Sequence, residues 1–413
     1  MAIRTELGTD EARPADDVDL RSVNLVDPAL YAGGDPYRVW AALRRHAPVY
    51  RHPATEMPAF WALTRYDDVK EVYRDHETYS SAQGILLRPE SDGSDPGGGR
   101  TLALTDPPRH RELRSLVERW FATRAVRRLA STMRPTVRDI VDRALDQGEC
   151  DFVADIAARL PLFVICGLMG VPSADHELIF QLTSQAFGAT EPRARSAAHQ
   201  EILRYFVALI QKRRRSPSND LVSALVHGRV EGRPLEADDI LLNCDNLLVG
   251  GTENVRLAAA GGMEVFLQHP DQWHRLGEEP HLMAPAVEEV LRWTSSATHI
   301  MRTATRQARL REHTIEPGDR VVLWIPSANR DESVFDEPDR FDIGRTPNRH
   351  LALGAGRHFC VGSVLARAEL TVLFTELRQR VADVEPAGAP VRLSSIVVNG
   401  LERLPVRLRA AGR

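Results

Sequence analysis

The feature that most constrains this chain is a single cysteine, Cys360, set among glycines directly before a predicted helix. Gly354 and Gly356 precede it, Gly362 follows it, and an apolar helical pattern then runs from near Val361 to about residue 381. A helix N-terminus offers unpaired N–H groups and a partial positive charge, and both favour a thiolate over a thiol. Glycines also let the backbone pass close to a flat ligand, because they carry no Cβ. The pattern indicates a metal-binding thiolate, and the alternative is an inert cysteine beside a glycine turn.

The other three cysteines have different surroundings. Cys150, Cys166 and Cys244 lie among apolar residues, and their spacing suits neither a zinc site nor a disulfide framework. We expect them to be buried, unreactive thiols. The net charge of −4 gives no general electrostatic reason to bind nucleic acid or an anionic membrane, so we expect neither as a partner.

Periodicity along the chain predicts a mostly helical protein with a small β lobe. Apolar residues after Asp106 recur on one helix face, at Leu113, Val117 and Trp120 among others. The expected segments are short strands near 48–50, 60–63, 320–325 and 391–409, helices after 108, over 239–267 and over 361–381, and an irregular, proline-rich meander over 326–350.

The expected organisation is a flexible N-terminal tail over residues 1–22 and a single catalytic domain over 23–413. The tail is acidic and carries no apolar run of a signal peptide. No later stretch approaches the roughly 20 apolar residues of a spanning helix. We therefore expect a soluble, cytoplasmic protein.

The segment around Cys360 resembles the cysteine loop of the cytochrome P450 family, whose usual form is Phe-Gly-x-Gly-x-His-x-Cys-x-Gly. Leu353 replaces the usual phenylalanine, which should alter the shielding of the sulfur without removing the ligand. The residues that match the motif are Gly354, Gly356, His358, Cys360 and Gly362.

The resemblance implies a mainly α fold with a small β lobe, in which haem b (iron protoporphyrin IX) lies between a long central helix and the cysteine-loop helix. Cys360 is then the axial iron ligand, and Gly354, His358 and Gly362 belong to the cofactor site. An axial thiolate pushes electron density onto haem iron and favours O–O cleavage.

Two distant segments support the resemblance. Glu289 and Arg292 match the family's Glu-x-x-Arg motif, stand at i and i+3 on one helix face, and have a structural role in the family, where they lock onto the meander. His110 and Arg114 stand at i and i+4, and two cationic donors fit a pair of haem propionates, although an isolated pair of this kind is more often a solvated helix face. The family's propionate-binding positions also include Arg302 and His350.

The centre of the long predicted helix departs from the family. Gly250 and Gly251 each cost about 1 kcal/mol against alanine inside a helix, which indicates either close packing of two helices or a local opening. Glu253 fits the family pattern Ala/Gly-Gly-x-Asp/Glu-Thr, but Asn254 replaces the threonine, whose hydroxyl helps to carry protons to dioxygen. An amide forms hydrogen bonds but is no proton acid. We expect Glu253 to lie on a proton path and Asn254 to be a hydrogen-bonding group near dioxygen.

By resemblance, substrate contacts come from the glycine-rich segment 82–104, the region 176–190, the helix at 243–250, and the stretches 295–300 and 396–398. Each candidate could equally belong to the ordinary core or surface. The candidates are Leu86, Leu87, Phe187, Asn243, Asn246, Ile300 and Val397.

The leading hypothesis is a haem-thiolate monooxygenase that hydroxylates or epoxidises a small molecule of specialised metabolism, either free or bound to a carrier protein. It would use O2 and two electrons from a separate ferredoxin or flavodoxin, because the chain ends without a reductase domain. Asn254 leaves a second hypothesis open, in which the same scaffold performs oxidative coupling, ring closure or desaturation. A third is a haem sensor or carrier without turnover.

Overall fold

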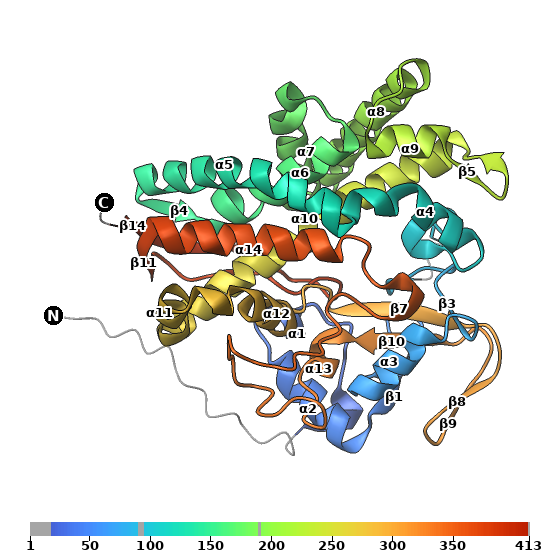
Figure 1. Ribbon diagram of the computed structural model, residues 1–413. Helices are drawn as coiled ribbons and strands as arrows, with labels where there is room; N and C mark the ends of the chain where they lie inside the picture. The colour runs from blue at the N-terminus through green and yellow to red at the C-terminus, as the bar shows by residue number, and fades with distance from the viewer. Residues whose placement is uncertain (1–17, 90–94, 189–190, 412–413) are drawn as a thin grey trace.

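The computed structural model describes residues 18–89, 95–188 and 191–411. In Figure 1 a helical body lies above α14 (Ser363–Arg380), and the β lobe lies below it. The expected fold class, mainly α with a small β lobe, is confirmed. The remaining helices are α1 (Ala29–Ala32), α2 (Pro36–His46), α3 (Tyr66–Arg74), α4 (Arg109–Phe121), α5 (Thr123–Gln147), α6 (Arg159–Met169), α7 (His176–Gly188), α8 (Pro192–Arg215), α9 (Leu221–His227), α10 (Ala237–Gln268), α11 (Pro270–Glu278), α12 (Met283–Thr294) and α13 (Ile325–Ala328).

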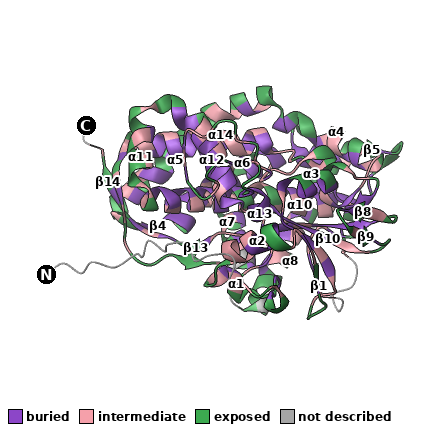
Figure 2. Cartoon of the chain, turned by 90° about the horizontal axis from the view of Figure 1, so that it is seen from below, coloured by how far each residue is buried: buried purple, intermediate pink, exposed green. Residues whose placement is uncertain are grey.

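Helix α10 runs through the centre of the body and packs against α6, α8, α9, α12 and α14. The apolar stripe predicted after Asp106 is confirmed in α4, where Leu113, Val117 and Trp120 are buried. Figure 2 shows the buried residues concentrated in the interior and the exposed residues at the rim. The body therefore holds α10 and α14 in fixed relation to each other, which positions the site.

The β lobe is built on a five-stranded sheet of order β1-β2-β10-β7-β3. Strand β10 pairs in parallel with β2 and antiparallel with β7, so that Val321 lies opposite Arg302. The strands of this sheet are β1 (Val49–His52), β2 (Phe60–Leu63), β3 (Tyr79–Ser80), β7 (His299–Ala304) and β10 (Arg320–Trp324).

Shorter strands complete the structure. A three-stranded sheet of order β11-β14-β4 joins the chain after α14 to the segment that follows α5, and three further pairs form two-stranded ribbons. These strands are β4 (Glu149–Asp151), β5 (Arg229–Val230), β6 (Arg233–Pro234), β8 (Ala308–Leu310), β9 (His313–Ile315), β11 (Val381–Pro386), β12 (Val391–Arg392), β13 (Leu401–Arg403) and β14 (Pro405–Ala410).

Two expectations about the chain's ends and its apolar stretches need correction. Most of the predicted tail, residues 1–17, lies outside the described residues, but Leu20–Ser22 forms a short 3-10 turn, and the Leu20 carbonyl accepts a hydrogen bond from Tyr50 Oη. In the described part, Phe152–Met169 is long and apolar enough to span a membrane by composition. Two thirds of it (67%) is buried inside the body, as in a core helix.

Candidate functional site

The loop before α14 presents Cys360. Its backbone N–H donates to the Leu353 carbonyl over 2.9 Å, which closes the loop. Gly354 and Gly356 have φ of 71° and 70°, the left-handed region that favours glycine. A Cβ at Gly356 would lie 2.5 Å from the Tyr73 carbonyl oxygen. Both glycines are thus required by backbone conformation, and Gly356 also by the close approach of α3.

The surroundings of the Cys360 thiol act on its pKa in opposite directions. Desolvation raises the pKa, while the Gly362 N–H and the guanidinium groups of Arg114 and Arg367 lower it, and the net result is a raised value. Helix α14 begins only at Ser363, so the thiol lies before its first turn. The expected preference for a thiolate is therefore absent from the protein alone. Coordination to a metal deprotonates a thiol outright, so a bound metal would favour the thiolate form of Cys360.

Two adjoining cavities lie between the Cys360 loop and α10. A Cβ at Gly250 would meet nothing within 4 Å, whereas one at Gly251 would lie 2.9 Å from the Ile165 side chain in α6. Gly251 thus permits close helix packing, and Gly250 leaves space open beside Cys360. The residues that line both cavities are Ala103, Phe121, Gly250, Gly251, His358, Cys360 and Gly362.

Three of the four predicted propionate-binding residues, together with His358, surround these cavities. His110 and Arg114 line one cavity, Arg302 lines the other, and His358 lines both. The rings of His110 and His358 have centroids 4.3 Å apart. Arg302 is 3% exposed, burial lowers its pKa, and no carboxylate within the described ranges forms an ion pair with it. A buried guanidinium without a counter-ion beside a cavity fits an anionic ligand.

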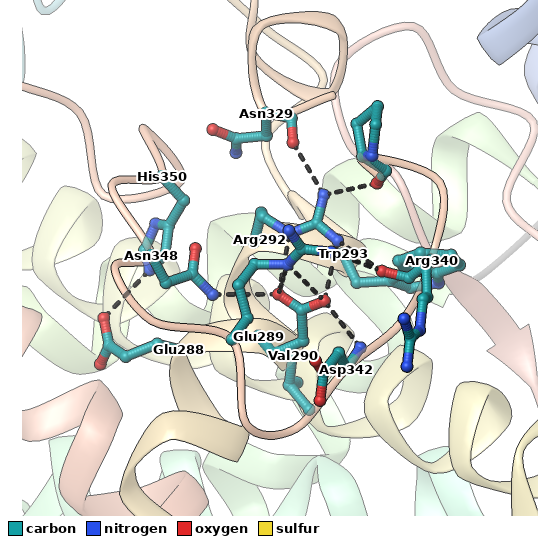
Figure 3. Close-up of polar contacts among 12 residues, drawn as sticks. Glu288, Glu289, Val290, Arg292, Trp293, Asn329, Arg340, Asp342, Asn348 and His350 are labelled. Atoms are coloured by element: carbon teal, nitrogen blue, oxygen red, sulfur yellow. Dashed lines mark hydrogen bonds and ion pairs between the residues drawn. The ribbon is translucent and has the colours of Figure 1, made fainter. Parts of the chain in front are cut away.

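His350 does not join this group. Its Nε2 lies 3.1 Å from Glu288 Oε2 (Figure 3). Its Nδ1 accepts the Ala352 backbone N–H over 3.3 Å. Arg367 donates to the same Glu288 carboxylate, so this charge is already well neutralised. Both ring nitrogens of His350 are engaged, and it lines neither cavity. The structure therefore contradicts the expected propionate-binding position.

Asp106, which sequence reasoning used only as a turn marker, belongs to the site. Burial alone would raise its pKa, but the His358 ring, 3.9 Å away, and hydrogen bonds from the Ser80 hydroxyl and the Ser81 N–H lower it to about 2. Burial, with the nearby charges of His358 and Arg114, lowers the pKa of His110 to about 4. The Asp-Pro-Pro sequence over residues 106–108, two residues before His110, was the feature from which a site role for Asp106 could have been predicted.

The donor set fits a haem. Among the described residues, no group of three or more His, Cys, Asp and Glu side chains could hold a metal ion. A metal bound by Cys360 would therefore take its other ligands from a cofactor. The cavities place one sulfur, a glycine-lined helix face and flanking cations together, which suits a flat macrocycle with two carboxylates.

The Glu-x-x-Arg motif fixes the meander next to this loop. Glu289 and Arg292 are both 0% exposed and share two hydrogen bonds of 2.8 Å. Arg292 also donates to the carbonyls of Asn329, Pro338 and Arg340, as Figure 3 shows. The pairing and the link to the meander agree with the structural role expected of this motif.

The polar residues of α10 point to different sides. Asn254 lines the Cys360 cavity, and its Oδ1 accepts a hydrogen bond from Ser296 Oγ over 3.2 Å. Glu253 instead lies in a separate cavity, where Arg256 Nη2 is 2.5 Å from its Oε2 and Arg403 is a neighbour. Glu253 is therefore not brought together with Asn254 beside Cys360, contrary to expectation.

The apolar substrate candidates divide in a similar way. Ile300 lines the Cys360 cavity, together with Ile85. Leu86 lines a different hollow of the β lobe, and Leu87 is buried, with its N–H donating to His299 Nε2. Val397 packs in the β lobe and is not among the described residues that line the Cys360 cavity. The Phe187 side chain lies outside the described residues. Only Ile300 of these candidates is placed near the thiol.

The two asparagine candidates also differ. Asn246 lines the cavity that contains His110 and Arg114. Both ends of the Asn243 amide are bonded to backbone groups: its oxygen accepts from the Leu102 N–H, and its NH2 group donates to the carbonyls of Arg100 and Asp239. Asn243 is therefore a structural group and not a substrate anchor. Ser296, which sequence reasoning did not single out, lies in the expected stretch 295–300.

Comparisons with known proteins agree with this geometry. The family model for Cytochrome P450 matches residues 171–382. Cytochrome P450 NovI of Streptomyces niveus is 39% identical over 395 residues, which cover 94% of this chain and 97% of the relative. A methyl-branched lipid omega-hydroxylase of Mycobacterium tuberculosis is 35% identical over 426 residues, with coverage of 98% and 99%. The crystal structure of P450 OxyD, involved in the biosynthesis of vancomycin-type antibiotics, superposes with a TM-score of 0.88 at 36% identity, covering 94% of this chain and all of that one (100%).

Proposed function

The chain belongs to the cytochrome P450 family of haem-thiolate monooxygenases, and we propose that it hydroxylates or epoxidises a small molecule of specialised metabolism. The observation that carries this proposal is the placement of Cys360 across a cavity from Gly250 and Asn254, with unpaired Arg302 at the edge. The similarity to OxyD supports an antibiotic-type substrate. We further propose that residues 23–413 form one catalytic domain located in the cytoplasm.

Each residue of the site has a proposed role. Haem, when bound, supplies the activation of dioxygen with two electrons and two protons, so that one oxygen atom enters the substrate and the other leaves as water. Cys360 would hold the iron through its sulfur. Arg114 and Arg302 would provide positive charge for the propionates. His110 and His358, whose pKa values are lowered by burial, would act as neutral hydrogen-bond donors.

The α10 residues act on the opposite side of the cavity. Gly250 leaves room beside the cofactor, and Asn254 presents an amide to the oxygen side. Glu253 is the proposed proton-path group, but Arg256 holds it in its own cavity, and it would need to leave that ion pair to reach Asn254. Glu289 and Arg292 support the loop without contacting the cofactor.

The substrate contacts that we propose are apolar. Ile85, Leu291, Ala297 and Ile300 line the cavity with Cys360, which suits a largely hydrophobic substrate segment. The substrate could be free or attached to a carrier protein, and both forms belong in a screen. A separate ferredoxin or flavodoxin is the proposed electron donor.

Asn254 favours one further candidate function on the same scaffold. Because an amide doesn't carry a proton as a hydroxyl does, oxidative coupling, ring closure or desaturation without oxygen insertion is the second candidate. Product masses separate the two: a gain of one oxygen atom supports monooxygenation, and a loss of two hydrogens supports the alternative.

The first test is the carbon monoxide difference spectrum of the reduced, haem-loaded protein. Wild type should give a long-wavelength Soret band of the thiolate type, and Cys360→Ala should lose it. The matched control is Cys150→Ala, which removes a buried thiol far along the chain and should keep the band. A wild-type spectrum without the thiolate band would contradict the proposed ligand.

A further inference from the structure

Ser296 and Asn254 meet in the Cys360 cavity from elements far apart in the chain. Asn254 lies near the middle of α10, and Ser296 lies in the connection between α12 and β7. The Ser296 hydroxyl donates to Asn254 Oδ1 over 3.2 Å, and both residues line the cavity that contains Cys360. The pair therefore brings a hydroxyl to the side of the cavity where α10 has none.

This hydrogen bond determines which end of the amide remains available. An asparagine side chain has one acceptor oxygen and an NH2 group with two donor hydrogens. Ser296 occupies Oδ1, and no group in residues 18–89, 95–188 and 191–411 accepts a hydrogen bond from Asn254 Nδ2. The NH2 group is thus the free end, and Asn254 serves the cavity as a hydrogen-bond donor.

The backbone of Ser296 is held in place independently of Asn254. Its carbonyl accepts the Asn399 backbone N–H over 2.8 Å, and Ala297 forms a β-bridge with Val398. Asn399 Nδ2 also donates to the Thr294 carbonyl over 2.7 Å, just before Ser296. The Ser296 hydroxyl therefore lies on a backbone segment that is fixed by hydrogen bonds, and it can fix the rotamer of Asn254.

Glu253 does not contact Asn254 in place of Ser296. Its carboxylate lies 2.5 Å from Arg256 in a different cavity, so the acid of the α10 motif faces away from Asn254. Within the described ranges, Ser296 provides the side-chain hydroxyl that Asn254 contacts.

We propose that Ser296 is a positioning residue that supplies the hydroxyl of the oxygen-side pair, in place of the threonine hydroxyl that Asn254 lacks, and that holds the Asn254 NH2 group toward the cavity. The inference rests on the proposed function and extends it to a named pair of residues on two elements. It predicts that the hydroxyl of Ser296, and not its volume, decides the orientation of Asn254.

The test uses the infrared stretching band of carbon monoxide bound to the reduced holoenzyme, which needs no substrate. A hydrogen-bond donor near the carbon monoxide oxygen lowers the stretching frequency and narrows the band. Ser296→Ala should raise the frequency and broaden the band toward that of Asn254→Leu. Ser296→Thr, which keeps a hydroxyl, should retain the wild-type band. Ser131→Ala is the matched control, because that hydroxyl bonds only within α5.

A second readout is the hydrogen peroxide released per electron consumed in air. Loss of one ordinary hydrogen bond corresponds to a factor of about five, so peroxide release should rise about five-fold in Ser296→Ala and return to wild type in Ser296→Thr. An unchanged band and unchanged peroxide release in Ser296→Ala would overturn the inference, as would a Ser296→Thr variant that behaves like Ser296→Ala. A wild type without the thiolate Soret band would instead overturn the proposed function on which the inference rests.

Discussion

Asn243 and Leu102 join the glycine-rich segment before α4 to helix α10, through a hydrogen bond of 2.9 Å from the Leu102 N–H to Asn243 Oδ1. The Asn243 NH2 group donates to the Arg100 carbonyl over 3.0 Å, and Arg100 Nε lies 2.6 Å from Asp239 Oδ1. This segment is thus fastened to α10 at its C-terminal end.

The first prediction concerns that attachment. Asn243→Ala removes the side-chain partner of the Leu102 N–H and of the Arg100 carbonyl at a position only 2% exposed, which should cost about 1–3 kcal/mol of unfolding free energy. Urea denaturation measures the cost, and limited proteolysis should show faster cleavage near residue 100. Asn246→Ala is the neighbouring control and should be close to wild type in both assays. Equal stability of the two variants would contradict the attachment.

Arg302 should oppose the folding of the cofactor-free protein and favour the loaded one. Its guanidinium is buried, donates to the Met301 carbonyl and forms no ion pair within the described residues. Burying a charge without an ion-pair partner costs free energy, so Arg302→Met should raise the melting temperature of the apoprotein. The same variant should retain less haem after gel filtration. A less stable apoprotein would show that Arg302 is already compensated without cofactor.

Acid should destabilise the protein through His299. Burial lowers its pKa to about 4, with the Ile396 carbonyl acting in the opposite direction. The unfolded value is about 6.5, so the unfolded state binds more protons between these two values, and stability falls as pH falls from about 6.5 to about 4. The linkage amounts to about 3 kcal/mol. In the folded state His299 Nδ1–H donates to Ile396, and Nε2 accepts from Leu87, which requires a neutral ring.

Unfolding free energies measured across this pH range check the linkage. His299→Gln should flatten the dependence on pH between about 4 and 6.5. His227→Gln, at an exposed histidine of α9, is the control and should keep the wild-type slope. An identical slope in wild type and His299→Gln would assign the acid sensitivity to other groups.

Arg292 should be indispensable for the meander. Arg292→Met removes the donor for three meander carbonyls and leaves the Glu289 carboxylate buried, a loss of about 3–5 kcal/mol. We expect poor haem incorporation and early urea unfolding. Arg340→Met, which removes an exposed ion pair with Glu337, is the control and should incorporate haem normally. Normal haem content in Arg292→Met would contradict a structural role for the motif.

Local sequence patterns predicted several features of this structure correctly. The glycine spacing around Cys360 predicted its loop, because left-handed φ values at Gly354 and Gly356 are a property of the residue type. The Glu289–Arg292 pair followed from i, i+3 geometry on one helix. The long helix now seen as α10 and the apolar stripe of α4 followed from periodicity, which is local as well.

The directions of polar side chains were decided only in three dimensions. His350 turns to Glu288, and Asn243 turns to backbone groups of the segment before α4. Each choice depends on which partner the fold brings within about 3 Å, and some of these partners lie more than 60 residues away along the chain. Sequence alone therefore determined which residue types and elements build the site. Tertiary packing decided which of them face the cysteine, because a side chain satisfies its hydrogen bonds with the nearest available group.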